Sequence, residues 1–153
     1  MANYIDQIRV EITTGRDRGA GTDGNVYLGI CGREFRCDTT ADDFEQGSTR
    51  TYIFGTLSTT YPTVFPNITQ EEYNHPSRPP LLPEDADAFP CYLRLSEDSS
   101  RWLLAGAKVW IDDEVEPHYV DAIGNNPIWM GDDCGCIYYL HKPDPEDGRQ
   151  RDR

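Results

Sequence analysis

The sequence predicts an all-β domain, an antiparallel β-sandwich of about eight short strands. Apolar and polar residues alternate in several short stretches, which is typical of strands that bury one face. Gly, Pro, Asn and Asp separate these stretches, and no stretch keeps a helical period over three turns. Many short strands punctuated by such turns favour a sandwich.

The expected strands follow one another along residues 1–141, which are predicted to form one domain. Each strand is centred on apolar residues at every second position, so that their side chains share one face. In chain order these residues are Ile8, Val10 and Ile12; Val26, Leu28 and Ile30; Tyr52 and Phe54; Leu93 and Leu95; Ala107, Val109 and Ile111; and the stretch 136–140.

Two segments depart from the strand pattern. Residues 56–90 hold many of the 11 prolines, including the runs 62–66 and 76–83, so they are predicted to be an irregular, Pro-rich loop excursion outside the sheets. We expect this excursion to be dispensable for folding. Residues 142–153 are charged and contain two prolines, which predicts a disordered tail.

The charge excludes one class of partner. The chain has 27 acidic and 14 basic residues, a net charge of -13, which repels nucleic acid. Spread-out acidity is typical of a well-solvated surface, and cation binding is the alternative. The N-terminus has neither the basic start nor the apolar run of a signal peptide, and no stretch is apolar enough for a transmembrane helix, so we expect a cytoplasmic location.

The five cysteines favour free thiols over a disulfide framework, because their number is odd and no secretion signal is seen. Cys134 and Cys136 form a C-x-C pair. Zinc would need two further ligands from Cys91, His118 or His141, at no recognised spacing, so a zinc site is disfavoured.

Two loops carry the oxygen atoms that a hard cation prefers. In the first, Gly19, Gly21 and Gly24 allow tight turns that bring carbonyl groups together, and Thr22 and Asp23 add side-chain oxygens. The second offers three carboxylates, from Asp38, Asp42 and Asp43. Calcium takes about six to eight oxygen ligands. The alternative is structural, because Asp is common in turns and Asp43 could instead cap its loop by accepting backbone amides.

A family resemblance rests on these same residues. The first block consists of 14–15, 19–23 and 25–27, followed by Asp43-Phe44-Glu45-Gln46-Gly47-Ser48-Thr49 leading into Tyr52. A weaker block consists of 93–95, Asp98, Trp102 and 107–111. Together they resemble the PLAT family (polycystin, lipoxygenase, alpha-toxin), whose fold is an eight-stranded antiparallel β-sandwich.

The resemblance implies two calcium sites. The first would use the carbonyl of Gly21 with Asp23 and Asp98. The second would use Asp38, the carbonyl of Ala41, and Asp43. The sequence departs from some relatives at Gly19, where they have an acid, and at Thr39, where they have an amide side chain.

The sequence favours a binding function over catalysis. It has no G-x-S-x-G, H-E-x-x-H or P-loop motif, and its three histidines fall in loops or at a strand end, so we expect neither an enzyme nor a small-molecule substrate. The resemblance implies docking to another protein within an assembly, as in polycystin-like members, or calcium-dependent docking to a membrane surface, as in lipoxygenases and alpha-toxins.

The candidate contact residues are apolar side chains of the Pro-rich excursion, the kind that anchor interfaces. They are Tyr61, Val64, Phe65, Ile68 and Tyr73. Phe44 and Trp102, although they flank the candidate calcium loops, are expected to be apolar plugs in the core.

Overall fold

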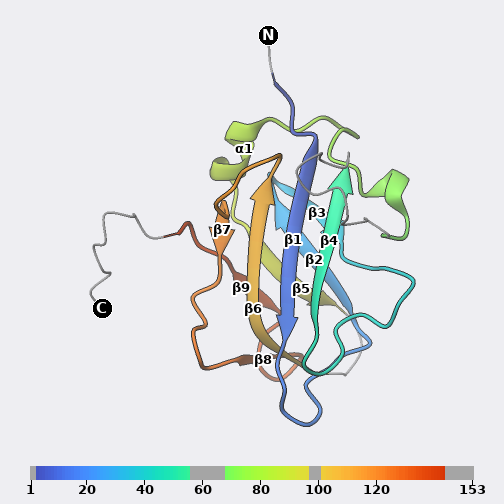
Figure 1. The fold of residues 1–153 in the computed structure, drawn as a ribbon, viewed down its shortest axis with the longest axis vertical. Helices are drawn as coiled ribbons and strands as arrows, with labels where there is room; N and C mark the ends of the chain where they lie inside the picture. Colours follow the sequence, from blue (N-terminus) through green and yellow to red (C-terminus); the bar gives the residue numbers. More distant parts are fainter. Residues whose placement is uncertain (1–2, 56–67, 97–100, 144–153) are drawn as a thin grey trace.

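Two antiparallel sheets form the protein, and their longer strands run along the long axis of the molecule (Figure 1). The structure is a computed structural model that describes residues 3–55, 68–96 and 101–143. The strands in these residues are β1 (Gln7–Thr14), β2 (Asn25–Ile30), β3 (Arg33–Arg36), β4 (Thr49–Gly55), β5 (Tyr92–Ser96), β6 (Trp102–Ile111), β7 (Tyr119–Val120), β8 (Ile128–Met130) and β9 (Ile137–Tyr139). The predicted all-β sandwich is confirmed.

One sheet has the strand order β4-β1-β6-β7, with β8 also paired to β6, and the other has the order β3-β2-β5-β9. The register brings apolar positions together: Ile8 lies opposite Phe54 on one side and Ile111 on the other. In the second sheet, Val26 lies opposite Leu95. A shift by one residue would turn these side chains to the outer face, so the alternating pattern fixes the register.

The core lies between the sheets, as the period-two pattern predicts. Side chains from both sheets and from the adjoining loops belong to one buried cluster. Its strand members include Ile8, Val10, Ile12, Val26, Leu28, Ile30, Tyr52, Phe54, Leu93, Leu95, Trp102, Leu104 and Val109.

The two ends of the sandwich differ. At one end, the lower one in Figure 1, lie the loops that follow β1 and β3, residues 15–24 and 37–48; we call them the glycine loop and the acidic loop. At the other end, β2 and β3 are joined by Cys31 and Gly32, both with positive φ, as a tight hairpin turn requires. No helix among the described residues is long and apolar enough to cross a membrane.

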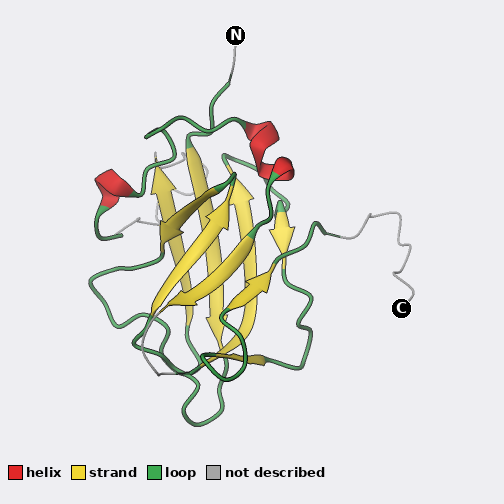
Figure 2. Cartoon of the chain, turned by 180° about the vertical axis from the view of Figure 1, so that it is seen from behind, coloured by secondary structure: helices red, strands yellow, loops and turns green. Residues whose placement is uncertain are grey.

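The described part of the Pro-rich excursion, residues 68–90, contributes to the core. It forms a 3-10 turn at Glu71–Tyr73 and the short helix α1 (Pro83–Ala88), both visible at one end of Figure 2. Leu81 and Ala86 are buried in the core cluster. The prolines of this part keep it out of the sheets, but the burial of Leu81 and Ala86 argues against the expectation that it is dispensable for folding.

Candidate functional site

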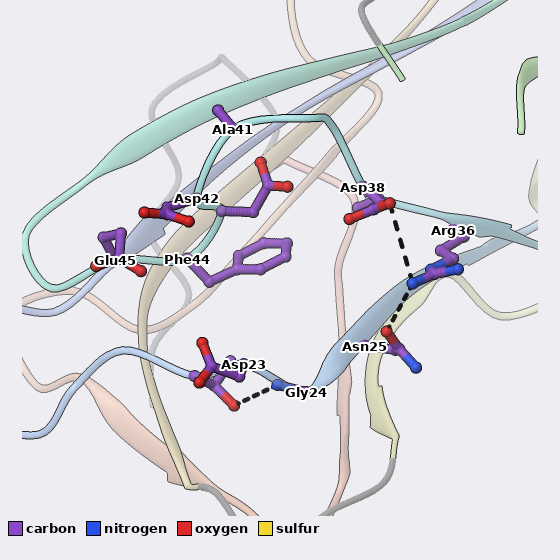
Figure 3. A pocket seen from close by; sticks show the side chains of 12 residues that line it. Asp23, Gly24, Asn25, Arg36, Asp38, Ala41, Asp42, Phe44 and Glu45 are labelled. Atoms are coloured by element: carbon purple, nitrogen blue, oxygen red, sulfur yellow. Dashed lines mark hydrogen bonds and ion pairs between the residues drawn. The ribbon is translucent and has the colours of Figure 1, made fainter. Parts of the chain in front are cut away.

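A cleft of about 200 Å³ lies where the glycine loop meets the acidic loop. Asp23 lies on one side, Ala41 and Asp42 lie on the other, and the Phe44 ring lies between them (Figure 3). The described residues that line it are Thr22, Asp23, Gly24, Asn25, Arg36, Cys37, Asp38, Ala41, Asp42, Asp43, Phe44 and Glu45. Loops 20 residues apart in sequence meet here because β2 and β3 form a hairpin that returns the chain to the same end.

Four of the six predicted calcium ligands line this cleft: Asp23, Asp38, Ala41 and Asp43. Gly21 lines an adjoining hollow that shares Asp23 with the cleft. The sixth, Asp98, lies outside the described residues. In the described part of the chain, no group of three or more His, Cys, Asp or Glu side chains is placed to hold a metal ion.

Asp43 organises the acidic loop from within. Its two carboxylate oxygens accept the backbone N–H and the hydroxyl of Thr39, both at 2.8 Å, and the hydroxyl of Tyr52 at 3.1 Å. The Arg50 guanidinium lies 4.0 Å away, and the Asp43 side chain is only 6% exposed. Burial, followed by the charge of Asp43, raises the pKa of Tyr52, so the phenol keeps its proton and donates it. The structural alternative, that Asp43 caps its own loop, describes this geometry.

Asp38 also has partners within the chain. Its carboxylate accepts the Thr69 hydroxyl, and the same oxygen lies 3.9 Å from the Arg36 guanidinium. Arg36 donates a second contact, of 2.9 Å, to the side-chain oxygen of Asn25 (Figure 3). The carboxylates of Asp38 and Asp43, which are predicted to coordinate calcium, therefore already accept hydrogen bonds from other groups of the protein.

Phe44 and Trp102 lie beneath the cleft and belong to the core, as predicted. Their rings contact edge to face with centroids 5.3 Å apart, and Phe44 also stacks on Tyr52 at 5.6 Å. Trp102 is fully buried, and its indole N–H donates to the Thr14 hydroxyl at 2.9 Å. Phe44 has a positive φ of 59°, an unusual conformation that turns the acidic loop so that the ring points inward.

The cysteines are free thiols in the structure, as expected. Cys31, Cys37 and Cys91 are buried, and burial raises the pKa of each, that of Cys31 to about 12. In the described part of the chain, Cys91 belongs to no group of three or more His, Cys, Asp or Glu side chains that could hold a zinc ion.

The predicted contact residues differ in how far their side chains are exposed. Tyr73 is 70% exposed, so its ring is available to a partner. Ile68 is 8% exposed and belongs to the core cluster, where it bridges to Thr39, so it has little surface to offer. Tyr61, Val64 and Phe65 lie outside the described residues.

A second surface, which sequence reasoning missed, covers the outer face of the four-stranded sheet. Tyr27 and Gly29 of β2 lie opposite Arg94 and Tyr92 of β5, which lie opposite Ile137 and Tyr139 of β9. We call this surface the tyrosine face; it consists of Tyr27, Glu34, Tyr92, Arg94, Ile137 and Tyr139. In each strand, these side chains occupy the positions between the ones that face the core. An alternating pattern that predicts the core therefore does not single them out.

Gly29 gives the tyrosine face its shape. A Cβ atom at this position would lie 2.2 Å from the Tyr92 ring, so only glycine allows that ring to lie directly over the sheet. The Tyr139 ring packs against Tyr92 with centroids 5.9 Å apart, and Arg94 lies over the Tyr27 ring at 4.4 Å. Tyr139 remains 53% exposed. The aromatic rings are thus held in place yet accessible.

The charges on this face are paired. Arg94 donates two hydrogen bonds, of 2.9 and 2.7 Å, to Glu34, and the Tyr92 hydroxyl donates a third, of 2.7 Å. The hydrogen bond from Arg94 lowers the pKa of Glu34, whereas burial and the bond to Glu34 raise the pKa of Tyr92 to about 12. At neutral pH the face therefore presents a neutralised ion pair among tyrosine rings.

The histidines with described contacts have structural partners. Both ring nitrogens of His118 contact carboxylates at 3.0 Å, Glu114 on one side and Asp87 of the α1 segment on the other. The Nδ1 atom of His75 accepts the backbone N–H of Ser77 and lies 2.8 Å from its hydroxyl. A catalytic Ser–His pair also needs a group that orients the base, and no carboxylate contact to His75 is found among the described residues.

Comparisons with known proteins identify the fold. No family model matches the sequence, and no curated protein does. Among solved structures, an alpha-toxin from Clostridium absonum matches with a TM-score of 0.60 and 21% identity over 92% of this chain. An alpha-toxin from Clostridium perfringens, isolated from an avian strain, matches with a TM-score of 0.57 and 20% identity over 90% of this chain.

A coral 8R-lipoxygenase, described as activated by calcium via a C2-like domain, matches with a TM-score of 0.53 and 16% identity over 89% of this chain. The chain spans 32% of each toxin chain and 17% of the lipoxygenase chain, so it corresponds to one part of these larger proteins. Strand content, sheet arrangement and these likenesses agree, and the chain has the fold of a PLAT-type β-sandwich domain.

Proposed function

We propose that the chain is a non-catalytic docking domain that binds another protein through the tyrosine face. The observation that supports this proposal is the arrangement of Tyr92, Tyr139 and Arg94 on one face of the sheet, where the Tyr139 ring is half exposed. Tyr and Arg are enriched among the residues that dominate protein interfaces. Because packing already fixes these side chains, little conformational entropy is lost when a partner covers them.

Charge supports a protein partner over an anionic membrane. The chain has a net charge of -13, and the Arg94 charge on this face is neutralised by Glu34. A basic residue near an anionic lipid surface contributes about 1 kcal/mol, and the tyrosine face has no unpaired basic residue among its six members to supply it. Tyr73, with Tyr61, Val64 and Phe65 of the Pro-rich excursion, remains a predicted additional contact.

A matched pair of variants tests this proposal. Tyr139→Ala removes an exposed ring from the tyrosine face, whereas Tyr4→Ala removes a ring of nearly equal exposure, 51% against 53%, at the N-terminus. The wild-type chain is used to capture proteins from an extract of the cells in which it occurs. The amount of each captured protein that the two variants retain is then measured. We expect Tyr139→Ala to weaken binding of a captured protein about 30-fold, a loss of about 2 kcal/mol, and Tyr4→Ala to leave it unchanged. Equal retention by both variants would exclude the tyrosine face.

Calcium-dependent membrane docking is the second candidate, supported by the likeness to the lipoxygenase described as calcium-activated via a C2-like domain. In this chain we assign the ion to the glycine loop, with the carbonyl of Gly21, Asp23 and Asp98 as ligands. A Cβ atom at Gly21 would lie 2.9 Å from the carbonyl oxygen of Phe44, so the backbone there is closely packed against the acidic loop.

Flotation with phosphatidylcholine–phosphatidylserine vesicles separates the two candidates. If the chain docks to a protein and not to a membrane, it stays in the bottom fraction, apart from the vesicles, both in calcium and in chelator. If calcium makes the chain float, and Asp23→Asn abolishes flotation, the membrane function takes first place.

A further inference from the structure

We propose that the guanidinium of Arg36 takes the place of calcium beside the Asp38 carboxylate, so that the acidic loop is held closed without a metal ion. The resemblance implies a calcium site made of Asp38, the carbonyl of Ala41, and Asp43, and the described geometry does not fit that ion. This inference concerns the acidic loop and does not depend on the proposed docking function.

Asp43 has most of its acceptor positions occupied, because a carboxylate offers about four and three donors already contact this one. Three donors, the N–H and hydroxyl of Thr39 and the hydroxyl of Tyr52, lie within 3.1 Å of its carboxylate. Oδ1 accepts the two hydroxyls and lies 4.0 Å from the Arg50 guanidinium, whereas Oδ2 accepts the Thr39 N–H, so bidentate coordination of calcium would compete with these partly buried hydrogen bonds. The bonds also tie the loop to β4 through Tyr52, which is fully buried.

Arg36 already provides a positive charge beside Asp38. Its guanidinium lies between the Asn25 side-chain oxygen, at 2.9 Å, and Asp38, at 3.9 Å, so it already contacts the kinds of oxygen that calcium prefers. Asn74 accepts the Arg36 backbone N–H at 2.7 Å, and Thr69 holds Asp38 from the other side. The two charges are thus fixed by neighbours on two segments.

Charges of both signs line the cleft. Its described lining residues include five carboxylates and one basic residue, which is Arg36. A divalent ion beside Asp38 would lie within a few ångströms of this positive charge, and the repulsion would oppose binding. The Arg36 charge offsets one of the five carboxylates and therefore weakens the binding of a cation at Asp38 relative to a cleft without this arginine.

The experiment removes Arg36 in a background without the glycine-loop site. Asp23→Asn is combined with Arg36→Gln, and the matched control combines Asp23→Asn with Arg33→Gln, which removes a charge from the other end of the same strand. Calcium affinity is measured by calorimetry, and the melting temperature is measured in calcium and in chelator. We expect Arg36→Gln to tighten calcium binding about tenfold or more relative to the control, and a further Asp38→Asn substitution to abolish the gain. Equal calcium responses of the Arg36→Gln and Arg33→Gln variants would overturn the proposal.

A second measurement uses the unmodified chain, in case the double variant does not fold. Hydrogen exchange of the Thr39 amide, which donates to Asp43, is followed in chelator and in calcium. A loop closed without metal protects this amide equally in both conditions. Fast exchange in chelator that slows on addition of calcium would show that the metal closes the loop, and would contradict the proposal whatever the docking partner is.

Discussion

At the end of the sandwich that holds the glycine and acidic loops, the residue type of an aspartate does not show whether it binds a metal or caps a turn. Aspartates in a Gly-rich context can bind calcium or cap a turn, and residue types alone do not separate these uses. The structure separates them at Asp43, which is surrounded by donors from Thr39 and Tyr52. Tyr52 lies nine residues from Asp43, in a strand, and the alternating pattern that predicts this strand does not reveal the contact.

Trp102 provides the first prediction at the residue scale. It is fully buried, contacts Phe44 and donates to Thr14, so Trp102→Ala should lower the free energy of unfolding by about 3 to 5 kcal/mol. Trp129→Ala, which removes a partly exposed ring from β8, is the control and should cost much less. Chemical denaturation measures both. A Trp102→Ala variant as stable as the wild type would show that the ring does not support the core.

Glu34 provides a pH-dependent prediction. Its hydrogen bond from Arg94 lowers its pKa in the folded state below the ordinary value of 4.5, so the bond stabilises the fold above that pH and loses this effect as pH falls through the lowered pKa. Glu34→Gln should therefore cost about 1 kcal/mol at neutral pH, since the pair is partly exposed, and the difference from wild type should shrink in acid. Denaturant titrations over a pH series measure this difference. A difference that does not change with pH would exclude the ion pair as its source.

At the scale of elements, the sequence predicts the long strands and, of the short ones, only β9. β1, β2, β5 and β6 alternate over enough residues to reveal one buried face, and the structure places their apolar positions in the core. β3, β7 and β8 have only two to four residues, which is too few for a period to appear. The short helix α1 was hidden for a related reason, because six residues beginning at a proline resemble a loop.

Helix α1 yields the prediction at this scale. Ala86 is fully buried, Ala88 on the same helix is exposed, and the Tyr119 hydroxyl donates to the carbonyl of Ala86. Ala86→Asp should destabilise the fold by about 3 to 5 kcal/mol, because it places an unpaired charge in the core, while Ala88→Asp should be nearly neutral. Thermal melts compare the two variants. If both melt like the wild type, residues 68–90 are not part of the core and the original expectation of a dispensable excursion returns.

At the scale of the whole molecule, the two ends and the outer face have different characters. The loop end gathers carboxylates whose charges are partly balanced by Arg36 and Arg50. The outer face of the four-stranded sheet presents tyrosines and a paired charge instead. Sequence patterns located the first surface, because its residues cluster along the chain, but not the second, whose members come from four strands and meet only through the register.

Site-specific photo-crosslinking tests whether the chain docks to a protein through the tyrosine face. A photo-reactive amino acid replaces Tyr139 in one chain and Tyr4 in another, and both chains are irradiated in the native extract. We predict a discrete crosslinked protein product from position 139 and none from position 4, because only the first ring lies on the tyrosine face. Crosslinks from position 139 to lipid alone, or the same protein product from both positions, would contradict the account.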